Sequence, residues 1–176
     1  MTVGSADQLT GFIRDVPDYP KPGILFKDIT PLLSDPNAFN AAVTLMAEPF
    51  KDKEIHKVVS IEARGFIFGS AISAYLKAGF VPVRKKGKLP YLTYEQTYQL
   101  EYGEDCLQVH QDSVLPGQNI LIVDDLLATG GTLGAVADLM SRFDVNVAGI
   151  ACLIELDFLN GRSKLPNHLI HTVLHY

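Results

Sequence analysis

Four short apolar runs recur along the chain, and each is followed by a polar or glycine-containing segment. They occupy residues 58–61, 80–83, 120–123 and 149–153. Their β-branched residues and short lengths predict strands that are buried on both faces of a parallel sheet. Apolar residues at helical spacing follow the first run, near residues 71–76, and the third run, at residues 133–143. This alternation predicts an α/β fold in which helices flank a parallel central sheet.

The segment between the second and third runs, residues 94–111, breaks this pattern. Apolar or aromatic residues alternate there with polar ones on both sides of Gly103. An alternation with a period of two predicts either an antiparallel hairpin or a flexible flap. The alternating residues are Tyr98, Leu100, Tyr102, Leu107 and Val109.

The third apolar run leads into the most informative segment of the chain. Asp124 and Asp125 follow directly, and the small residues of the segment 128–132 come before the next helix. Backbone N–H groups at a helix N-terminus favour a phosphate, and glycines allow it to approach closely. Aspartates aimed at a phosphate would repel it, so we assign them to ribose hydroxyl groups or to a hydrated Mg²⁺. The segment therefore predicts a site for a phosphorylated ribose, against the alternative of a solvated Asp-Asp pair before an ordinary glycine turn.

Two common nucleotide motifs are missing from the sequence. A P-loop requires a lysine after its last glycine, whereas Thr132 follows Gly131, and no G-x-G-x-x-G fingerprint occurs. Nucleotide hydrolysis at a Walker-type site is therefore not expected.

The composition agrees with the predicted α/β fold and excludes some classes of partner. The chain has 176 residues, of which 47% are hydrophobic and 20% charged, and this suits one globular domain over residues 1–176. A formal net charge of −5 argues against a nucleic-acid partner. The first ten residues are polar, and no apolar stretch approaches the length of a membrane span, so we expect a cytoplasmic protein without a membrane partner. Cys106 and Cys152 lack metal-binding spacing and are interpreted as reduced packing residues.

One basic cluster stands out from this acidic background. Arg84, Lys85, Lys86 and Lys88 directly follow the second apolar run. A cationic loop at the end of a strand suits a small polyanion better than a polymer, although a basic turn alone is usually only solvated.

Residues 119–132 resemble the signature with which type I phosphoribosyltransferases bind 5-phosphoribosyl 1-pyrophosphate (PRPP). The resemblance implies that family's fold and a role for Asp124, Asp125 and the loop 128–132 in holding PRPP through its ribose and 5-phosphate. The loop residues concerned are Ala128, Thr129, Gly130, Gly131 and Thr132.

Two further segments are similar to one branch of that family, the adenine phosphoribosyltransferases. Residues 62–66 match its pyrophosphate loop, which implies that Arg64 grips pyrophosphate and takes part in catalysis. Residues 84–90 match its next basic loop, and the resemblance extends pyrophosphate binding to Arg84, Lys85 and Lys88.

Residues 13–33 resemble the N-terminal hood of the adenine-specific branch, so we define residues 1–33 as the hood. The resemblance implies that the backbone at Leu25 and Lys27 reads the purine edge. It also implies that Phe26 stacks on one face of adenine and that Leu156 packs on the other. Phe26 and Leu156 could instead be ordinary core residues.

Residues 95–103 correspond to the mobile flap of that family, and we extend the predicted flap to residues 87–111. The resemblance makes Glu101 the general acid/base near the purine and Tyr102 a residue that closes over PRPP and pyrophosphate. Arg64 and Glu101 are thus the expected catalytic residues.

The whole resemblance implies a purine-salvage enzyme that forms AMP and pyrophosphate from adenine and PRPP through an oxocarbenium-like transition state. It implies Mg²⁺ as cofactor, with no direct protein ligand, held mainly through PRPP and water near Asp124 and Asp125. It also implies a homodimer. The alternatives are a phosphoribosyltransferase for another base and a non-catalytic, PRPP-sensing regulatory protein on the same scaffold.

Overall fold

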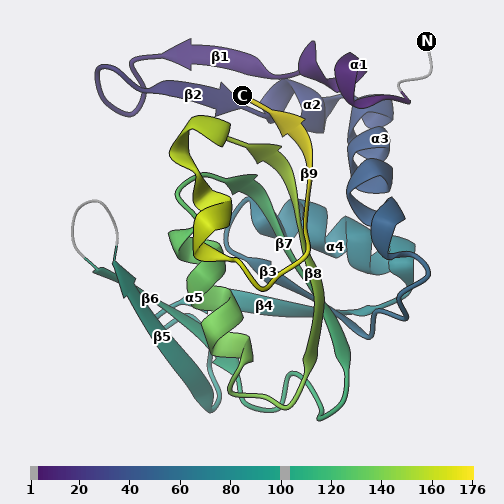
Figure 1. Cartoon of the computed structure of the whole chain (residues 1–176), viewed down its shortest axis with the longest axis vertical. Coiled ribbons are helices and arrows are strands. Elements are labelled where there is room, and N and C mark those ends of the chain that lie inside the picture. The colour runs from purple at the N-terminus through teal and green to yellow at the C-terminus, as the bar shows by residue number, and fades with distance from the viewer. Residues whose placement is uncertain (1–3, 100–103) are drawn as a thin grey trace.

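The computed structural model describes residues 4–99 and 104–176. A seven-stranded sheet with the order β5-β6-β4-β3-β7-β8-β9 forms its centre (Figure 1). The parallel strands are β3 (Lys57–Ile61), β4 (Gly79–Lys85), β7 (Asn119–Leu127), β8 (Asn146–Glu155) and β9 (Ile170–His175). The predicted parallel sheet with flanking helices is confirmed.

The predicted hairpin is also present, and it makes one edge of the sheet antiparallel. Strands β5 (Thr93–Gln99) and β6 (Glu104–His110) pair with each other, and β6 pairs with the end of β4. Tyr94 lies edge-on to Phe143, with 5.2 Å between the ring centroids, and so anchors the hairpin beside the end of α5 (Gly131–Met140).

Alternating residues of the inner strands divide the core into two layers. Val58 and Leu121 face the first layer, where the sheet packs against α3 (Pro36–Ala47) and α4 (Gly65–Leu76). Val59 and Ile122 face the second layer, which is covered by α5 (Gly131–Met140). This two-sided burial explains why the strands read as continuous apolar runs.

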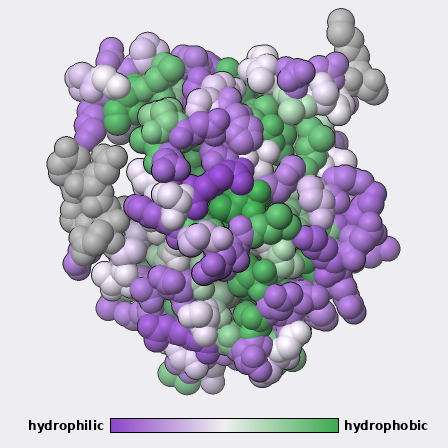
Figure 2. All heavy atoms as spheres, in the orientation of Figure 1, coloured by the Kyte–Doolittle hydropathy of each residue, from purple (hydrophilic) through white to green (hydrophobic). Residues whose placement is uncertain are grey.

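The described part of the hood contains a separate two-stranded antiparallel sheet. It consists of β1 (Arg14–Pro17) and β2 (Leu25–Asp28), preceded by α1 (Ala6–Thr10) and followed by α2 (Thr30–Ser34). The remaining short helices are η1 (Glu48–Phe50), η2 (Asp157–Leu159) and η3 (Gly161–Lys164). Apolar side chains lie at the surface near β2 and η2 (Figure 2), where Leu25 and Phe158 are exposed.

Strand β7 is longer than its apolar run. We predicted a strand over residues 120–123 with both aspartates beyond its end, but β7 continues to Leu127. The reason is pairing with β8, in which Asp124 lies opposite Cys152 and Leu127 opposite Glu155. Backbone pairing thus carries the aspartates inside the strand and fixes their directions.

None of the helices in residues 4–99 and 104–176 is both long enough and apolar enough to cross a membrane.

Candidate functional site

Two adjoining hollows lie at the carboxyl ends of β3 and β7, where ligands of open α/β sheets bind. The first has a volume of 200 Å³ and is lined by the loop 128–132. The second has a volume of 460 Å³ and is lined by residues of β3, β4, β5 and β6. Both hollows share Arg64, Asp124, Asp125 and Thr132, so they form one continuous site.

The loop 128–132 turns the chain from β7 into α5. Gly130 is the residue before the helix and has a φ of 76°, a left-handed conformation that glycine adopts without strain. The first turn of α5 receives no side-chain cap from Gly130, the residue before the helix. Its N–H groups are therefore available to an anion, and the positive end of the helix dipole adds to the attraction.

Asp124 and Asp125 have different neighbours. The Oδ1 atom of Asp124 accepts a hydrogen bond of 2.9 Å from the backbone N–H of Asp125, and Asp125 lies 3.0 Å from Nε of Arg64. Burial, together with the adjacent Asp125 carboxylate, raises the pKa of Asp124 well above its usual value. Burial also raises the pKa of Asp125, although the Arg64 charge opposes the shift. Two buried acids beside a single cation favour a ligand that supplies hydroxyl donors or positive charge.

Arg64 lies at the junction of the two hollows, at the start of α4. Its guanidinium group is 5.2 Å from the ring centroid of Phe26, so the hood contacts the site here. Gly65 allows the close approach, since a Cβ atom at that position would lie 2.7 Å from Oδ1 of Asp124. The ends of β3 and β7 can therefore bring Arg64 onto Asp125.

The four basic residues of this cluster, of which Arg84 and Lys85 end β4 and Lys86 and Lys88 follow it, do not form a free cationic patch. Arg84 and Lys88 both bind Glu62, at 2.7 Å each. Lys85 binds Asp105 at 2.9 Å, and Lys86 binds Glu95 at 3.0 Å. Of these four side chains, Lys85 lines the larger hollow. The structure therefore brings Lys85 together with Arg64, whereas Arg84 and Lys88 reach the site through Glu62.

Glu62 is held as a carboxylate by these two cations. Burial alone would raise its pKa, but hydrogen bonds from Lys88 and Arg84 outweigh burial and lower it. Glu62 itself lines the larger hollow.

Tyr98 and Asp105 are site residues that our sequence analysis did not assign. They lie opposite each other in the β5–β6 hairpin, and both line the larger hollow. Tyr98 hydrogen bonds to Thr132 of the phosphate loop, and its pKa is raised, mainly by burial. The alternating pattern of β5 was a signal for Tyr98, but the partner of Tyr98 depends on the hairpin register.

The predicted adenine-binding residues are not among those that line the two hollows. Phe26 is half-buried, with Tyr19 edge-on at 5.1 Å, and Leu25 is exposed. Leu156 follows β8, and its N–H group donates to the carbonyl oxygen of Leu127 at 3.0 Å. Phe26 therefore contacts Arg64 from the hood, whereas Leu156 lies beside the strand that leads into the phosphate loop.

The side chain of Lys27 also has clear partners. It lies 2.7 Å from Asp15 and 3.8 Å from the ring centroid of Tyr176. These contacts attach the hood to the segment after β9, for which the sequence offered no motif. Glu101 and Tyr102 lie outside the described residues, so their predicted roles stay predictions.

A different group has spacing suited to a metal ion. Ligand atoms of Glu155, Asp157 and His175 lie within 4.8 Å of one another. However, both carboxylate oxygens of Glu155 already accept hydrogen bonds from Arg162. The chemistry of this group therefore fits an ion-pair network better than a metal site.

Comparisons with known proteins agree with this geometry. Residues 28–171 match the family model for the phosphoribosyl transferase domain. A protein of Solidesulfovibrio magneticus named adenine phosphoribosyltransferase is 53% identical over 166 residues, which cover 94% of this chain and 97% of the relative.

Two solved structures are also similar. The adenine phosphoribosyltransferase of Rhodothermus marinus has a TM-score of 0.92 and 52% identity, covering 97% of this chain and 98% of the other. The enzyme of Saccharomyces cerevisiae, solved with an imino-altritol bisphosphate and adenine, has a TM-score of 0.91 and 38% identity, covering 96% of this chain and 98% of the other.

Proposed function

The chain belongs to the phosphoribosyltransferase family, within its adenine phosphoribosyltransferase branch, and we propose that it transfers the 5-phosphoribosyl group of PRPP to adenine. The products are AMP and pyrophosphate. The observation that carries this function is the shared wall of the two hollows, where Arg64 and the Asp124–Asp125 pair lie between the uncapped start of α5 and the hairpin.

The reaction needs no protein nucleophile. The N9 atom of adenine forms a bond to C1′ of the ribose while the bond from C1′ to the pyrophosphate oxygen breaks. The protein must align the reactants and stabilise the negative charge on the leaving group. In our proposal the loop 128–132 anchors the 5-phosphate, and Asp124 and Asp125 accept hydrogen bonds from the ribose hydroxyl groups.

Pyrophosphate binding is assigned chiefly to Arg64 and Lys85. Both line the larger hollow, and the planar guanidinium group of Arg64 can bind two phosphate oxygens together. We propose that Arg84 and Lys88 support this side of the site through their shared partner Glu62.

The donor set also suits Mg²⁺ bound with PRPP. Asp124 and Asp125 supply hard oxygen atoms at the border of the two hollows, where they can accept hydrogen bonds from water in a hydrated ion. The bound ion would neutralise charge on the pyrophosphate group.

Adenine is placed between the hood and Leu156. Leu25 and Lys27 are two residues apart in β2, so their backbone groups face the same edge of the strand. One N–H donor and one carbonyl acceptor can match N1 and the 6-amino group of adenine, whereas a 6-oxo purine presents the opposite pattern. Phe26 supplies a stacking surface beside Arg64.

Three further assignments complete the proposal. Glu101 acts as the general acid/base for the purine proton, and Tyr102 closes over PRPP. Both belong to a flap over residues 87–111. The chain forms a single domain, whose hood is residues 1–33. We propose a homodimer. We also place the enzyme in the cytoplasm, with support from Cys106 and Cys152, which are both free thiols.

A base panel tests the function. The purified protein is incubated with PRPP, Mg²⁺ and one free base at a time, and nucleotide formation is measured by chromatography. We expect AMP from adenine and at least 10²-fold less product from guanine, hypoxanthine or uracil, because a mismatched polar edge leaves buried groups unpaired. Preferential use of another base would overturn the adenine assignment, and no product from any base would favour the regulatory alternative.

A further inference from the structure

Two glycines bring a distant segment against the back of the phosphate loop. A Cβ atom on Gly130 would lie 2.3 Å from the carbonyl oxygen of Gly161, and one on Gly161 would lie 2.2 Å from that of Ala128. These distances are far inside van der Waals contact, so the two backbones pack directly on each other. The start of η3 therefore packs against the side of the phosphate loop that faces away from the hollow.

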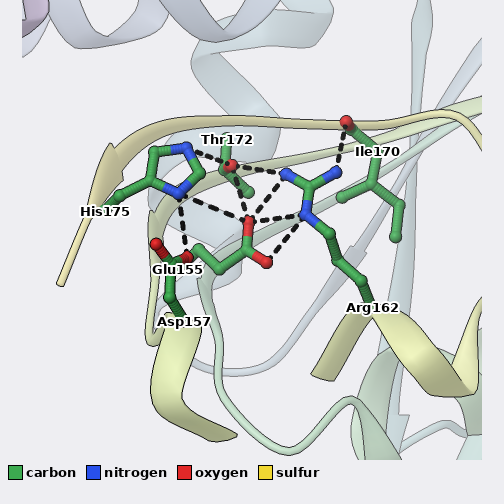
Figure 3. A network of polar contacts seen from close by, with 6 residues as sticks. All are labelled: Glu155, Asp157, Arg162, Ile170, Thr172 and His175. Carbon is green, nitrogen blue, oxygen red and sulfur yellow. Dashed lines mark hydrogen bonds and ion pairs between the residues drawn. The ribbon is translucent and has the colours of Figure 1, made fainter. Parts of the chain in front are cut away.

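A dense polar network fixes the segment that carries Gly161. Nε of Arg162 donates to both carboxylate oxygens of Glu155, at 2.7 and 2.9 Å, and Nη2 donates to one of them at 2.7 Å. Arg162 also donates to Thr172 at 2.8 Å and to the carbonyl oxygen of Ile170 at 3.0 Å. Figure 3 shows the guanidinium group joining the end of β8 to β9.

Glu155 is well suited to act as the fixed point of this network. Its side chain is only 5% exposed, and Thr172 donates a further hydrogen bond of 2.8 Å. Burial would raise the pKa of Glu155, but the hydrogen bonds from Arg162 and Thr172 outweigh it and lower the pKa. The carboxylate therefore remains charged, and a charge-assisted pair with several hydrogen bonds holds its geometry closely.

Glu155 also lies beside the strand that leads into the loop. Glu155 lies opposite Leu127 in the pairing of β7 with β8. Leu127 is the residue directly before Ala128. Arg162 is adjacent to Gly161 in the chain. The ion pair thus joins β8, the neighbour of the strand that leads into the phosphate loop, to the segment behind that loop.

We propose that Arg162 is a positioning residue for the 5-phosphate, acting through Glu155 to hold the Gly161 backbone against the phosphate loop. The inference rests on the proposed function and deepens it. Arg162 is not among the residues that line either hollow, so it acts through the loop and not by touching the phosphate.

Two substitutions and one control test this assignment. Gly161→Ala leaves every charge in place but forces its Cβ atom and the oxygen of Ala128 apart by roughly 1 Å to restore van der Waals distance. Arg162→Lys keeps the positive charge but loses the planar fork. Gly134→Ala, in α5 beyond the loop, is the matched control, because its N–H group already donates to the carbonyl oxygen of Gly130 and a Cβ atom there meets nothing within 4 Å.

The readouts are KM and kcat for PRPP and adenine, calorimetric binding of ribose 5-phosphate, and thermal unfolding. A displacement of about 1 Å can reduce a rate by about 10²-fold, so we expect kcat/KM for PRPP to fall by about that factor in Gly161→Ala. We expect about a tenfold fall in Arg162→Lys, because the charge remains while the fork is lost. In both variants ribose 5-phosphate should bind more weakly. KM for adenine should change by less than about twofold, since the hood is not displaced. All constants of the control Gly134→Ala should also change by less than about twofold.

Unchanged ribose 5-phosphate binding in folded Arg162→Lys would overturn the inference. So would a loss of kcat with both KM values and ribose 5-phosphate binding intact, because the 5-phosphate would then be held as in the wild type. If Gly161→Ala does not fold, Arg162→Lys carries the test alone. Failure of the proposed function would appear separately, as a wild-type protein that forms no AMP.

Discussion

Replacing Arg64 with methionine separates the role of this residue in stability from its role in the reaction. The substitution removes the guanidinium group that lies 3.0 Å from Asp125 and 5.2 Å from the Phe26 ring, and it keeps most of the aliphatic volume. It leaves Asp125, whose side chain is 8% exposed, without its cation. Both stability and turnover should therefore fall, for different reasons.

The magnitude follows from the surroundings of the pair. Breaking a fully buried ion pair costs about 3–5 kcal/mol, but Arg64 is 39% exposed and solvent screens part of the interaction. Asp125 can also take up a proton, because burial has already raised its pKa. We therefore expect a loss of about 1–2 kcal/mol in the free energy of unfolding at pH 7. The loss should shrink as the pH falls and Asp125 becomes protonated in both proteins.

Urea unfolding and steady-state kinetics, measured together with the double variant Arg64→Met/Asp125→Asn, distinguish the two effects. The neutral amide removes the unpaired charge, so the double variant should recover most of the stability lost by Arg64→Met. Turnover should remain at least about 10²–10³-fold below wild type, since the cation facing the leaving group is still missing and the Asp125 carboxylate assigned to the ribose is now missing too. Recovery of turnover along with stability would refute the assignment of Arg64 to pyrophosphate.

Three further predictions concern neighbouring groups. Lys85→Met should raise KM for PRPP about tenfold, whereas the control Lys86→Met should change it by less than about twofold, because only Lys85 of these two residues lines the larger hollow. Initial-rate kinetics measure both KM values. Asp124→Asn should raise the melting temperature in Mg²⁺-free buffer, and the difference should grow as the pH rises above 3.8. The reason is that the raised pKa of Asp124 makes wild-type stability fall as the pH rises above that ordinary value; a constant difference would contradict this. Gly130→Ala should cost at least about 1–2 kcal/mol in urea unfolding, because φ is 76°; a neutral result would contradict the described turn.

The apolar runs predicted the inner strands because burial on both faces leaves a clear signal in composition. They did not predict that β7 continues through Asp124 to Leu127, since that extension comes from pairing with β8, which hydropathy does not record. The hairpin was visible as an alternation. Its register, which places Tyr98 opposite Asp105, was not, because register depends on the turn and on the neighbouring strand.

The same distinction applies to the site, where some features could be predicted from the sequence and others depend on tertiary contacts. The phosphate loop could be predicted because aspartates, glycines and a helix start are contiguous in residues 124–132, whereas Arg64 was assigned from the resemblance of residues 62–66 to a loop of the family. The basic loop was predicted as a group, but the separation of Lys85 from Arg84 and Lys88 depends on where Glu62 and Asp105 lie in space. The contact of Gly161 with Gly130 joins segments 31 residues apart and involves no side chain, so no pattern of residue types could indicate it.

If one continuous site transfers phosphoribose from PRPP to adenine, the wild-type enzyme must form AMP and pyrophosphate together. PRPP, adenine and excess Mg²⁺ are mixed with the protein, and phosphorus NMR follows AMP and pyrophosphate in the same tube. We expect the two products to appear in equal amounts and neither to form from PRPP when adenine is omitted. Pyrophosphate without AMP, or PRPP left intact in the presence of adenine, would contradict it.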